Sequence, residues 1–204
     1  MTTRIVVATR NAGKVPELER LVALPGVSLV PITVLAPEMP DVVETGTTFE
    51  ANAILKARQT ALHTGEIALG DDSGLEVDAL GGAPGIHSAR YSGAGAKANV
   101  EKLLAALEGV PEAARTARFR CVIAVVDPAR PDEPLLATGR CEGAIARAPR
   151  GAHGFGYDPI FLPVDRDGRT MAELDDAEKD AISHRGVACR ALAPSLASWL
   201  RARR

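Results

Sequence analysis

The chain has 204 residues, a formal net charge of −2 and only 3% aromatic residues. This length suits one domain, or one domain of two lobes, with a core built mainly of Ala, Val, Leu and Ile. The charge gives no support for a protein that coats nucleic acid or lies on a membrane, whereas a small anionic substrate needs only local basic residues. Three cysteines without CxxC spacing are expected to be reduced and buried in a cytosol-like compartment, and we expect no signal peptide or membrane span.

A β-branched run at residues 4–9 predicts a buried strand, and a helix is expected from about Pro16 to Leu24. Between them lies the sequence Arg-Asn-Ala-Gly-Lys, residues 10–14. Strand, glycine loop, basic residue and helix form a layout that can hold phosphate on backbone N–H groups. The P-loop consensus is not met, since Ala8 stands at its first glycine position and Val15 where its hydroxyl residue belongs. A plain turn with a surface lysine explains this stretch equally well when it is taken alone.

A second strand is expected at residues 27–34, followed by a proline-rich acidic loop at 36–43. Thr47 and Glu50 have the spacing of a capping box, in which the side chain of each residue accepts a hydrogen bond from the backbone N–H of the other. This spacing predicts a helix from there to about Thr64.

Single charged residues around this helix are weaker signals. Lys56 lies on the helix, and Glu44 is a loop acid just before it. Taken alone, Glu44 is explained best as a solvated charge or as a complement to the helix dipole.

The most informative stretch runs from Gly70 to Gly93 and follows a short apolar run, residues 67–69, that predicts a buried strand. Asp71 and Asp72 stand at its end, where open α/β sheets place their ligands. Neighbouring residues of an extended chain point to opposite sides, so both carboxylates can face one ligand only if the chain turns, and Ser73–Gly74 is the expected turn. We expect one acid to reach a metal or a water molecule and the other to anchor the loop. A hairpin with a solvated Asp pair is the alternative.

The later part of the chain predicts a mixed sheet. The expected elements are a helix at residues 96–107, strands at 118–127 and 135–146 joined by a turn through 128–132, a helix at 171–182, and a final helix capped by Ser183. The two strands form a hairpin and are therefore antiparallel. The predicted fold class is α/β, with a mixed, twisted central sheet flanked by helices.

Aromatic residues between glycines form a second candidate site. Phe155 and Tyr157 alternate with Gly154 and Gly156, so a ring can lie flat against a planar ligand, and stacking on a base is worth about 1–3 kcal/mol. We favour stacking over a core plug for Phe155 and leave Tyr157 open. The charged pair at residues 184–185 opposes the dipole of the final helix, which favours an anionic or electron-rich ligand there.

Together these segments resemble the inosine/xanthosine triphosphate pyrophosphatases, enzymes that remove non-canonical purine nucleotides. The motifs that carry the resemblance are TRNAGK, ETGTTFEANAILKA, GDDSGLEVDALGGAPGIHSARYSG, FGYDPIF and SHRG, and they span nearly the whole chain in order. Val43 and Ala51 depart from the commonest pattern, in which acids are frequent.

The resemblance implies one domain over residues 1–204, with two lobes and an active-site cleft. It implies hydrolysis of ITP, dITP and XTP to the nucleoside monophosphate and pyrophosphate, with Mg²⁺ as cofactor, in a cytoplasmic homodimer that binds neither nucleic acid nor membrane. It assigns catalysis to Asp72 and metal binding to Glu44 and Asp72. The implied substrate-binding residues are Thr9, Arg10, Asn11, Ala12, Gly13, Lys14, Lys56, Ser73, Phe155, Gly156, Tyr157, Asp158, Lys179, His184 and Arg185.

Elementary chemistry agrees with this assignment. A triphosphate carries about four negative charges, which Mg²⁺ and lysines can neutralise. Arg185 or Lys179 can donate to a purine 6-oxo group, whereas the 6-amino group of adenine leaves that charge unpaired. This argument does not explain how guanine is rejected.

Two other functions fit the same residues. A nucleotide-binding module without catalysis keeps the phosphate loop and the aromatic site but makes Asp71 and Asp72 structural. A related pyrophosphatase could act on modified pyrimidines instead of purines. A panel of nucleotides separates both from the leading hypothesis.

Overall fold

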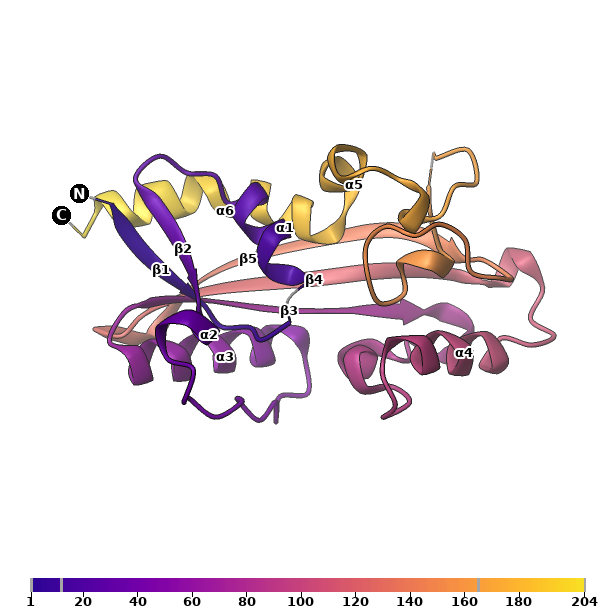
Figure 1. Ribbon diagram of the computed structural model, residues 1–204, viewed down its shortest axis with the longest axis horizontal. Coiled ribbons are helices and arrows are strands. Elements are labelled where there is room, and N and C mark those ends of the chain that lie inside the picture. Colours follow the sequence, from indigo (N-terminus) through magenta and orange to yellow (C-terminus); the bar gives the residue numbers. More distant parts are fainter. Residues whose placement is uncertain (1, 12, 165, 204) are drawn as a thin grey trace. The chain divides into compact units, whose positions relative to one another are not determined.

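The computed structural model describes residues 2–11, 13–164 and 166–203. Six strands form one sheet in the order β2-β1-β3-β4-β5-β6 (Figure 1). The strands are β1 (Thr3–Val7), β2 (Val27–Pro31), β3 (Ile67–Val77), β4 (Thr116–Asp127), β5 (Arg130–Ile145) and β6 (Phe161–Pro163). The helices are α1 (Lys14–Leu21), α2 (Ile32–Leu35), α3 (Phe49–Thr64), α4 (Ala96–Ala106), α5 (Asp176–Ile182) and α6 (His184–Arg201).

The sheet combines both kinds of pairing. Strand β1 runs parallel to β2 and to β3, whereas β5 and β6 are antiparallel. The α/β class with a mixed sheet, predicted from the sequence, is therefore confirmed.

The chain divides into two compact units. Unit 1 contains residues 1–72, 121–139 and 185–204, and unit 2 contains residues 73–120 and 140–184. The division falls inside β3, β4 and β5, so each of these strands contributes residues to both units.

In unit 1, helices cover both faces of the strands: α3 lies on one face and α6 on the other (Figure 1). Ile5 and Val7 of β1 and Leu69 of β3 pack into one apolar cluster with α1 and with residues such as Leu192 of α6. The alternate residues of β3 face α3, because successive side chains of a strand point to opposite faces. Odd-numbered residues such as Leu69 therefore face α1 and α6, and even-numbered residues of β3 in unit 1 face α3.

Gly70 marks the closest approach between β3 and α3. A Cβ atom at this position would lie 2.7 Å from the backbone nitrogen of Ala57 and closer still to the carbonyl oxygen of Ala53. Both neighbours are backbone atoms of a helix, so they cannot move aside as a side chain could. The glycine allows α3 to pack directly on the strand that carries the two aspartates.

We expect Gly70→Ala to lower the free energy of unfolding by about 3 kcal/mol, at the upper end of the usual cost of overpacking. Urea denaturation measures the loss. Gly65→Ala is a matched control, because Gly65 has φ +69° but no atom within 4 Å of the added Cβ, and it should cost about 1 kcal/mol. A Gly70 variant as stable as the Gly65 variant would contradict the close approach.

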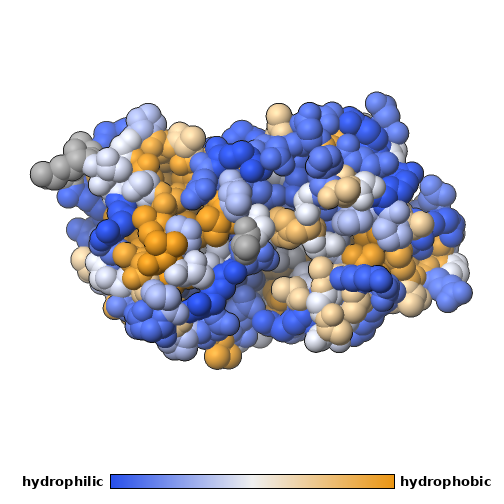
Figure 2. Space-filling model, viewed as in Figure 1, coloured by the Kyte–Doolittle hydropathy of each residue, from blue (hydrophilic) through white to orange (hydrophobic). Residues whose placement is uncertain are grey.

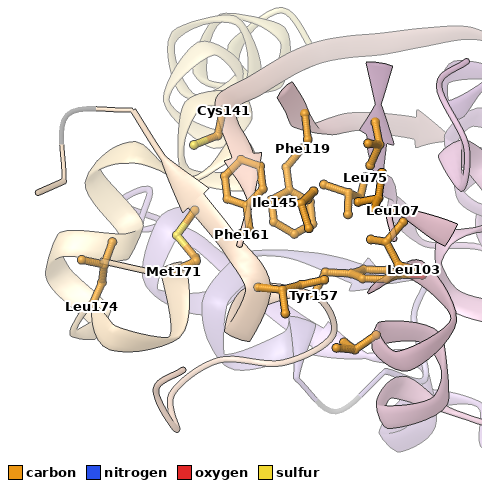
Figure 3. Close-up of a cluster of buried hydrophobic side chains, with 14 residues drawn as sticks. Leu75, Leu103, Leu107, Phe119, Cys141, Ile145, Tyr157, Phe161, Met171 and Leu174 are labelled. Atoms are coloured by element: carbon orange, nitrogen blue, oxygen red, sulfur yellow. The ribbon is translucent and has the colours of Figure 1, made fainter. Parts of the chain in front are cut away.

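The core of unit 2 combines aromatic rings with aliphatic side chains such as Leu75 and Leu103 (Figure 3). Phe119 and Phe161 pack with ring centroids 4.6 Å apart, and Tyr157 lies in the same cluster. Tyr157, which the sequence left open between a ligand contact and a core position, therefore lies in the core of unit 2. Phe155 is only half-buried.

Four local predictions were wrong in detail. The second strand ends at Pro31, and residues 32–35 form α2 instead of continuing it. The cap of α3 is Thr48, whose hydroxyl accepts from the backbone N–H of Ala51 at 3.1 Å, and Thr47 does not hold that place. The turn between β4 and β5 contains only residues 128–129.

The fourth concerns the helix expected at residues 171–182. The structure forms a short 3₁₀ turn at 171–173 and begins α5 at Asp176. Leu174 between them is extended and fully buried. Two consecutive capping boxes, Thr170 with Glu173 and Asp175 with Glu178, fix this interruption.

Hydrophilic side chains cover most of the face shown in Figure 2, and an apolar patch lies over β2 and α1. Strand β2 is at the edge of the sheet, and most of its residues are half-buried. The three cysteines are free and buried, as predicted. Among the described helices, none has the length and hydropathy that crossing a bilayer requires.

Candidate functional site

Asp71 and Asp72 lie inside a continuous strand. Strand β3 runs from Ile67 to Val77 without interruption, so the turn expected at Ser73–Gly74 is wrong. The strand continues because Leu75 and Val77 are fully buried in the apolar cluster of unit 2. The two acids therefore point to opposite faces of the sheet, and each meets its own set of cations.

Asp71 lies on the face that carries α1 and α6. Its Oδ2 accepts from Arg185 Nε at 3.2 Å, and Oδ1 is paired with the ammonium of Lys14. Glu17 of α1 accepts from the same arginine, and Cys121 Sγ lies 3.0 Å from Asp71 Oδ2. Arg185 and Asp71 are 1% and 2% exposed, so this is a buried ion-pair network.

Asp72 lies on the face that carries α3. Its Oδ1 is 2.7 Å from the Lys56 ammonium, and the same ammonium is 2.9 Å from Glu44 Oε1. Asn52, one helical turn before Lys56, points its amide nitrogen at Asp72 Oδ2 at 3.4 Å and accepts from the backbone N–H of Gly46 at 2.8 Å. Through Asn52 and Lys56, helix α3 thus connects the loop at Glu44–Gly46 to Asp72.

These surroundings shift the pKa values of the two acids in opposite directions. Burial raises the pKa of Asp72 above 3.8, and the charge of Lys56 offsets this only in part. Burial would also raise the pKa of Asp71, but Arg185 and Lys14 hold it well below 3.8. Burial alone would lower the pKa of Lys56, but the charges of Asp72 and Glu44 raise it above 10.5. Asp72 is therefore the acid that takes up a proton more readily, as a general base must.

The loop at residues 9–14 is held mainly by its own polar groups. The N–H of Asn11 donates to Thr9 Oγ1 at 3.2 Å, and the N–H of Gly13 donates to Asn11 Oδ1 at 2.9 Å. Arg10 is turned toward the following acidic loop, where it donates to the carbonyl of Pro37 at 3.1 Å and pairs with Asp41 at 2.7 Å. Lys14, at the end of this loop, pairs with Asp71, and Ala12 lies outside the described residues.

The predicted base-binding residues of unit 2 form their own cluster. The Lys179 ammonium lies 4.9 Å from the centre of the Phe155 ring and 2.9 Å from Asp158 Oδ2. The same Oδ2 accepts from the backbone N–H of Phe155 at 2.8 Å. Asp158 and Lys179 are both 4% exposed, so a buried charged pair fixes a half-buried aromatic ring.

Other predicted residues of this set have mainly packing contacts. The Tyr157 hydroxyl donates to the carbonyl of Ser88 at 2.9 Å inside the core. The His184 ring stacks on Phe119 with centroids 4.7 Å apart. Gly156 has φ +63°, which permits the turn after Phe155. Ser73 is half-buried within β3.

Sequence reasoning missed two partners of the site, Glu17 and Asn52. Asn52 and Lys56 have the i, i+4 spacing that places side chains on one helix face, so a closer look at α3 could have found Asn52. Glu17 and Arg185 are separated by 168 positions, and no local pattern connects them.

Glu44 and Asp72, the two carboxylates that contact Lys56, are our candidates for holding a metal. Within the described residues, no group of three or more His, Cys, Asp or Glu side chains converges as a complete metal cage. Mg²⁺ commonly uses one or two carboxylates and completes its shell with water and substrate phosphates. Glu44 and Asp72 already share one cation between them, so these residues fit that ion.

Comparison with known proteins identifies the family. A sequence profile described as the Ham1 family matches residues 5–195. The chain belongs to the Ham1 family. A Ham1-family relative named dITP/XTP pyrophosphatase from Yersinia pseudotuberculosis is 53% identical over 195 residues, which cover 95% of this chain and 98% of that protein. One of the same name from Methylococcus capsulatus is 49% identical over 198 residues, covering 96% and 97%.

A solved Ham1 structure supports the fold. The HAM1 protein from Coxiella burnetii matches with a TM-score of 0.85 at 46% identity, covering 97% of this chain and all of that one. The resemblance to pyrophosphatases found in the sequence is therefore confirmed at the level of family and fold. Of the two departures from the common pattern, Val43 is 73% exposed, and its side chain is not part of the Glu44–Lys56–Asp72 group described above.

Proposed function

We propose that this Ham1 protein hydrolyses dITP, ITP and XTP between the α- and β-phosphates and releases the nucleoside monophosphate and pyrophosphate. Relatives named dITP/XTP pyrophosphatases are about 50% identical to this chain, and the match covers nearly their whole length. The single observation that carries the mechanism is the convergence of Asp72 and Glu44 on one cation. That arrangement suits a reaction in which a polyphosphate must be neutralised while a water molecule is activated.

Asp72 is the general base of this proposal. Its raised pKa keeps it basic enough to accept a proton from water, and the Asn52 amide restrains its second oxygen. Asp72 orients the water for attack on the α-phosphorus and takes its proton, and pyrophosphate leaves. The neighbouring Asp71 cannot exchange roles with it, because it faces the other side of the sheet and pairs with Arg185.

Cations of unit 1 bind the phosphates. Lys14 pairs with Asp71, Lys56 pairs with Asp72 and Glu44, and each ammonium has three donors. Backbone groups and side chains of residues 9–13 complete the phosphate loop. Glu44 and Asp72 would hold Mg²⁺, which supplies charge neutralisation and a template for the phosphates when bound.

Base recognition is assigned to Phe155, with Gly156, Tyr157, Asp158, Lys179, His184 and Arg185 as its supporting residues. A base that contacts the Phe155 ring meets a hydrogen-bond donor in Lys179, which suits a purine 6-oxo group. Lys179 is favoured over Arg185 for this contact, because Arg185 donates to Asp71 and Glu17. Ser73, next to Asp72, is proposed to contact the substrate as well.

Three broader properties belong to the same proposal. Residues 1–204 act as one catalytic domain, the protein is a homodimer, and it works in the cytoplasm. Free, buried cysteines support the last of these. Size-exclusion chromatography with light scattering measures the oligomeric state.

The deciding experiment is pyrophosphate release across a nucleotide panel, with and without Mg²⁺. We expect rapid release from dITP and XTP, release at least about 10³-fold slower from dATP, and none without a divalent cation. Tight binding of dITP without turnover would favour a binding module instead. Faster cleavage of modified pyrimidine nucleotides than of dITP would overturn the assignment of the base.

A further inference from the structure

Lys56 occupies the place that the proposed metal requires. Its ammonium contacts Glu44 Oε1 at 2.9 Å and Asp72 Oδ1 at 2.7 Å, so a single positive charge already bridges the two carboxylates. The lysine side chain is only 12% exposed, and those of Glu44 and Asp72 are 19% and 8% exposed. Water therefore screens this contact only weakly.

The other oxygen of Asp72 has a partner of its own. Asn52 directs its amide nitrogen to Asp72 Oδ2, and the same side chain is fixed by the N–H of Gly46 through its own oxygen. Asn52 is fully buried, so this orientation is held by packing as well as by hydrogen bonds. Oδ1, the atom that Lys56 contacts at 2.7 Å, is thus the Asp72 oxygen at which a cation is already held.

An ammonium and a magnesium ion cannot share these atoms. Mg²⁺ binds oxygen at about 2.0–2.1 Å, and a second positive charge at hydrogen-bond distance from the same oxygens would be strongly repelled. A lysine has a flexible four-carbon stem, so its charge can move while its backbone stays in α3.

We propose that Lys56 is a resident cation that competes with Mg²⁺ for Glu44 and Asp72 in the nucleotide-free protein. The inference rests on the proposed function, which places Mg²⁺ at these carboxylates. Lys56 keeps the two acids neutralised and in position when no metal is bound, and Mg²⁺ must displace it. The triphosphate offers the displaced ammonium new partners, so the metal binds well only together with its substrate.

Calorimetric titration of Mg²⁺ into the full-length, nucleotide-free protein tests the competition. We expect Lys56→Met to bind Mg²⁺ at least about tenfold more tightly than the wild type, because one unit charge beside a divalent ion outweighs the 1.4 kcal/mol of a tenfold change. Lys56→Arg keeps the charge and should bind Mg²⁺ no more tightly than the wild type. Lys97→Met, which removes a 92% exposed lysine paired with Glu101, should leave the affinity unchanged.

Two further variants separate the possible failures. Glu44→Gln should abolish Mg²⁺ binding in both the wild-type and Lys56→Met backgrounds, and Lys56→Gln serves if the Met variant does not fold. If Glu44→Gln abolishes binding but neither neutral variant binds more tightly than the wild type, the competition is wrong and the metal site stands. If Glu44→Gln leaves binding unchanged, the metal site is wrong and the competition falls with it. Equal tightening by Lys56→Arg and Lys56→Met would also overturn the competition.

Discussion

Asp72→Asn is expected to slow pyrophosphate release from dITP by about 10³-fold or more. Removing a positioned general base costs about 10²–10⁴-fold, and this residue also supplies one of two carboxylates for the proposed metal. Asparagine has nearly the same shape and its one oxygen can still accept from Lys56, while its amide nitrogen replaces the oxygen that accepts the long 3.4 Å contact from Asn52, so the folded structure should persist. Single-turnover rates at saturating dITP and Mg²⁺ measure the effect, and thermal melting shows whether the variant is folded.

Asp132→Asn is a suitable control for this variant. Asp132 lies in the same unit, but its side chain is 77% exposed and pairs with Arg58 at the surface, so the rate should stay within about twofold of the wild type. A rate for Asp72→Asn above a tenth of the wild type would exclude Asp72 as the base.

Arg185→Met should lower the free energy of unfolding by about 3–5 kcal/mol, the cost of leaving buried charges without their partner. Asp71 and Glu17 are 2% and 6% exposed, and both accept from Arg185. Methionine fills much of the volume of the arginine stem, so the loss reports mainly on the charge. Urea denaturation at pH 7 measures it.

The same network makes a signed prediction about pH. The folded-state pKa of Asp71 lies well below 3.8, so its stabilising effect is fully present above that value and is lost only as the pH falls through the lowered pKa. In Arg185→Met, Asp71 loses the guanidinium that lowers its pKa and takes up a proton at a higher pH, so the stability difference from the wild type should narrow below about pH 5. Adding Asp71→Asn to Arg185→Met should recover part of the loss at pH 7. No recovery would mean that packing, and not charge, explains the effect.

Much of the fold could be predicted from the sequence because its signals are local. The β-branched run of β1, the alternation of β4 and the amphipathic pattern of α4 each predict an element within a few residues of its observed bounds. The errors arose where tertiary packing decides. The turn was expected because Ser73 and Gly74 are typical turn residues. The strand β3 continues past them because Leu75 and Val77 enter the core of unit 2.

The candidate site was predictable in type but not in its pairings. Asp72, Lys56 and Glu44 were found through the motifs of a known family, and the structure places these three together. The partnership of Asp71 with Arg185 was not predicted, because the two residues are 114 positions apart. Tyr157 could not be assigned from sequence, since a ring between glycines can either meet a ligand or fill a core, and here its side chain fills the core of unit 2.

The alternation of side chains along β3 has a consequence for natural variation at two adjacent codons. An Asp-to-Asn change looks equally mild at either position, yet at residue 71 it removes an anchor of the fold and should reduce how much protein accumulates in the cell. The same change one residue later should leave normal amounts of a protein that no longer turns over its substrate. Protein abundance measured beside turnover therefore distinguishes the two kinds of damage, although the sequence change is the same.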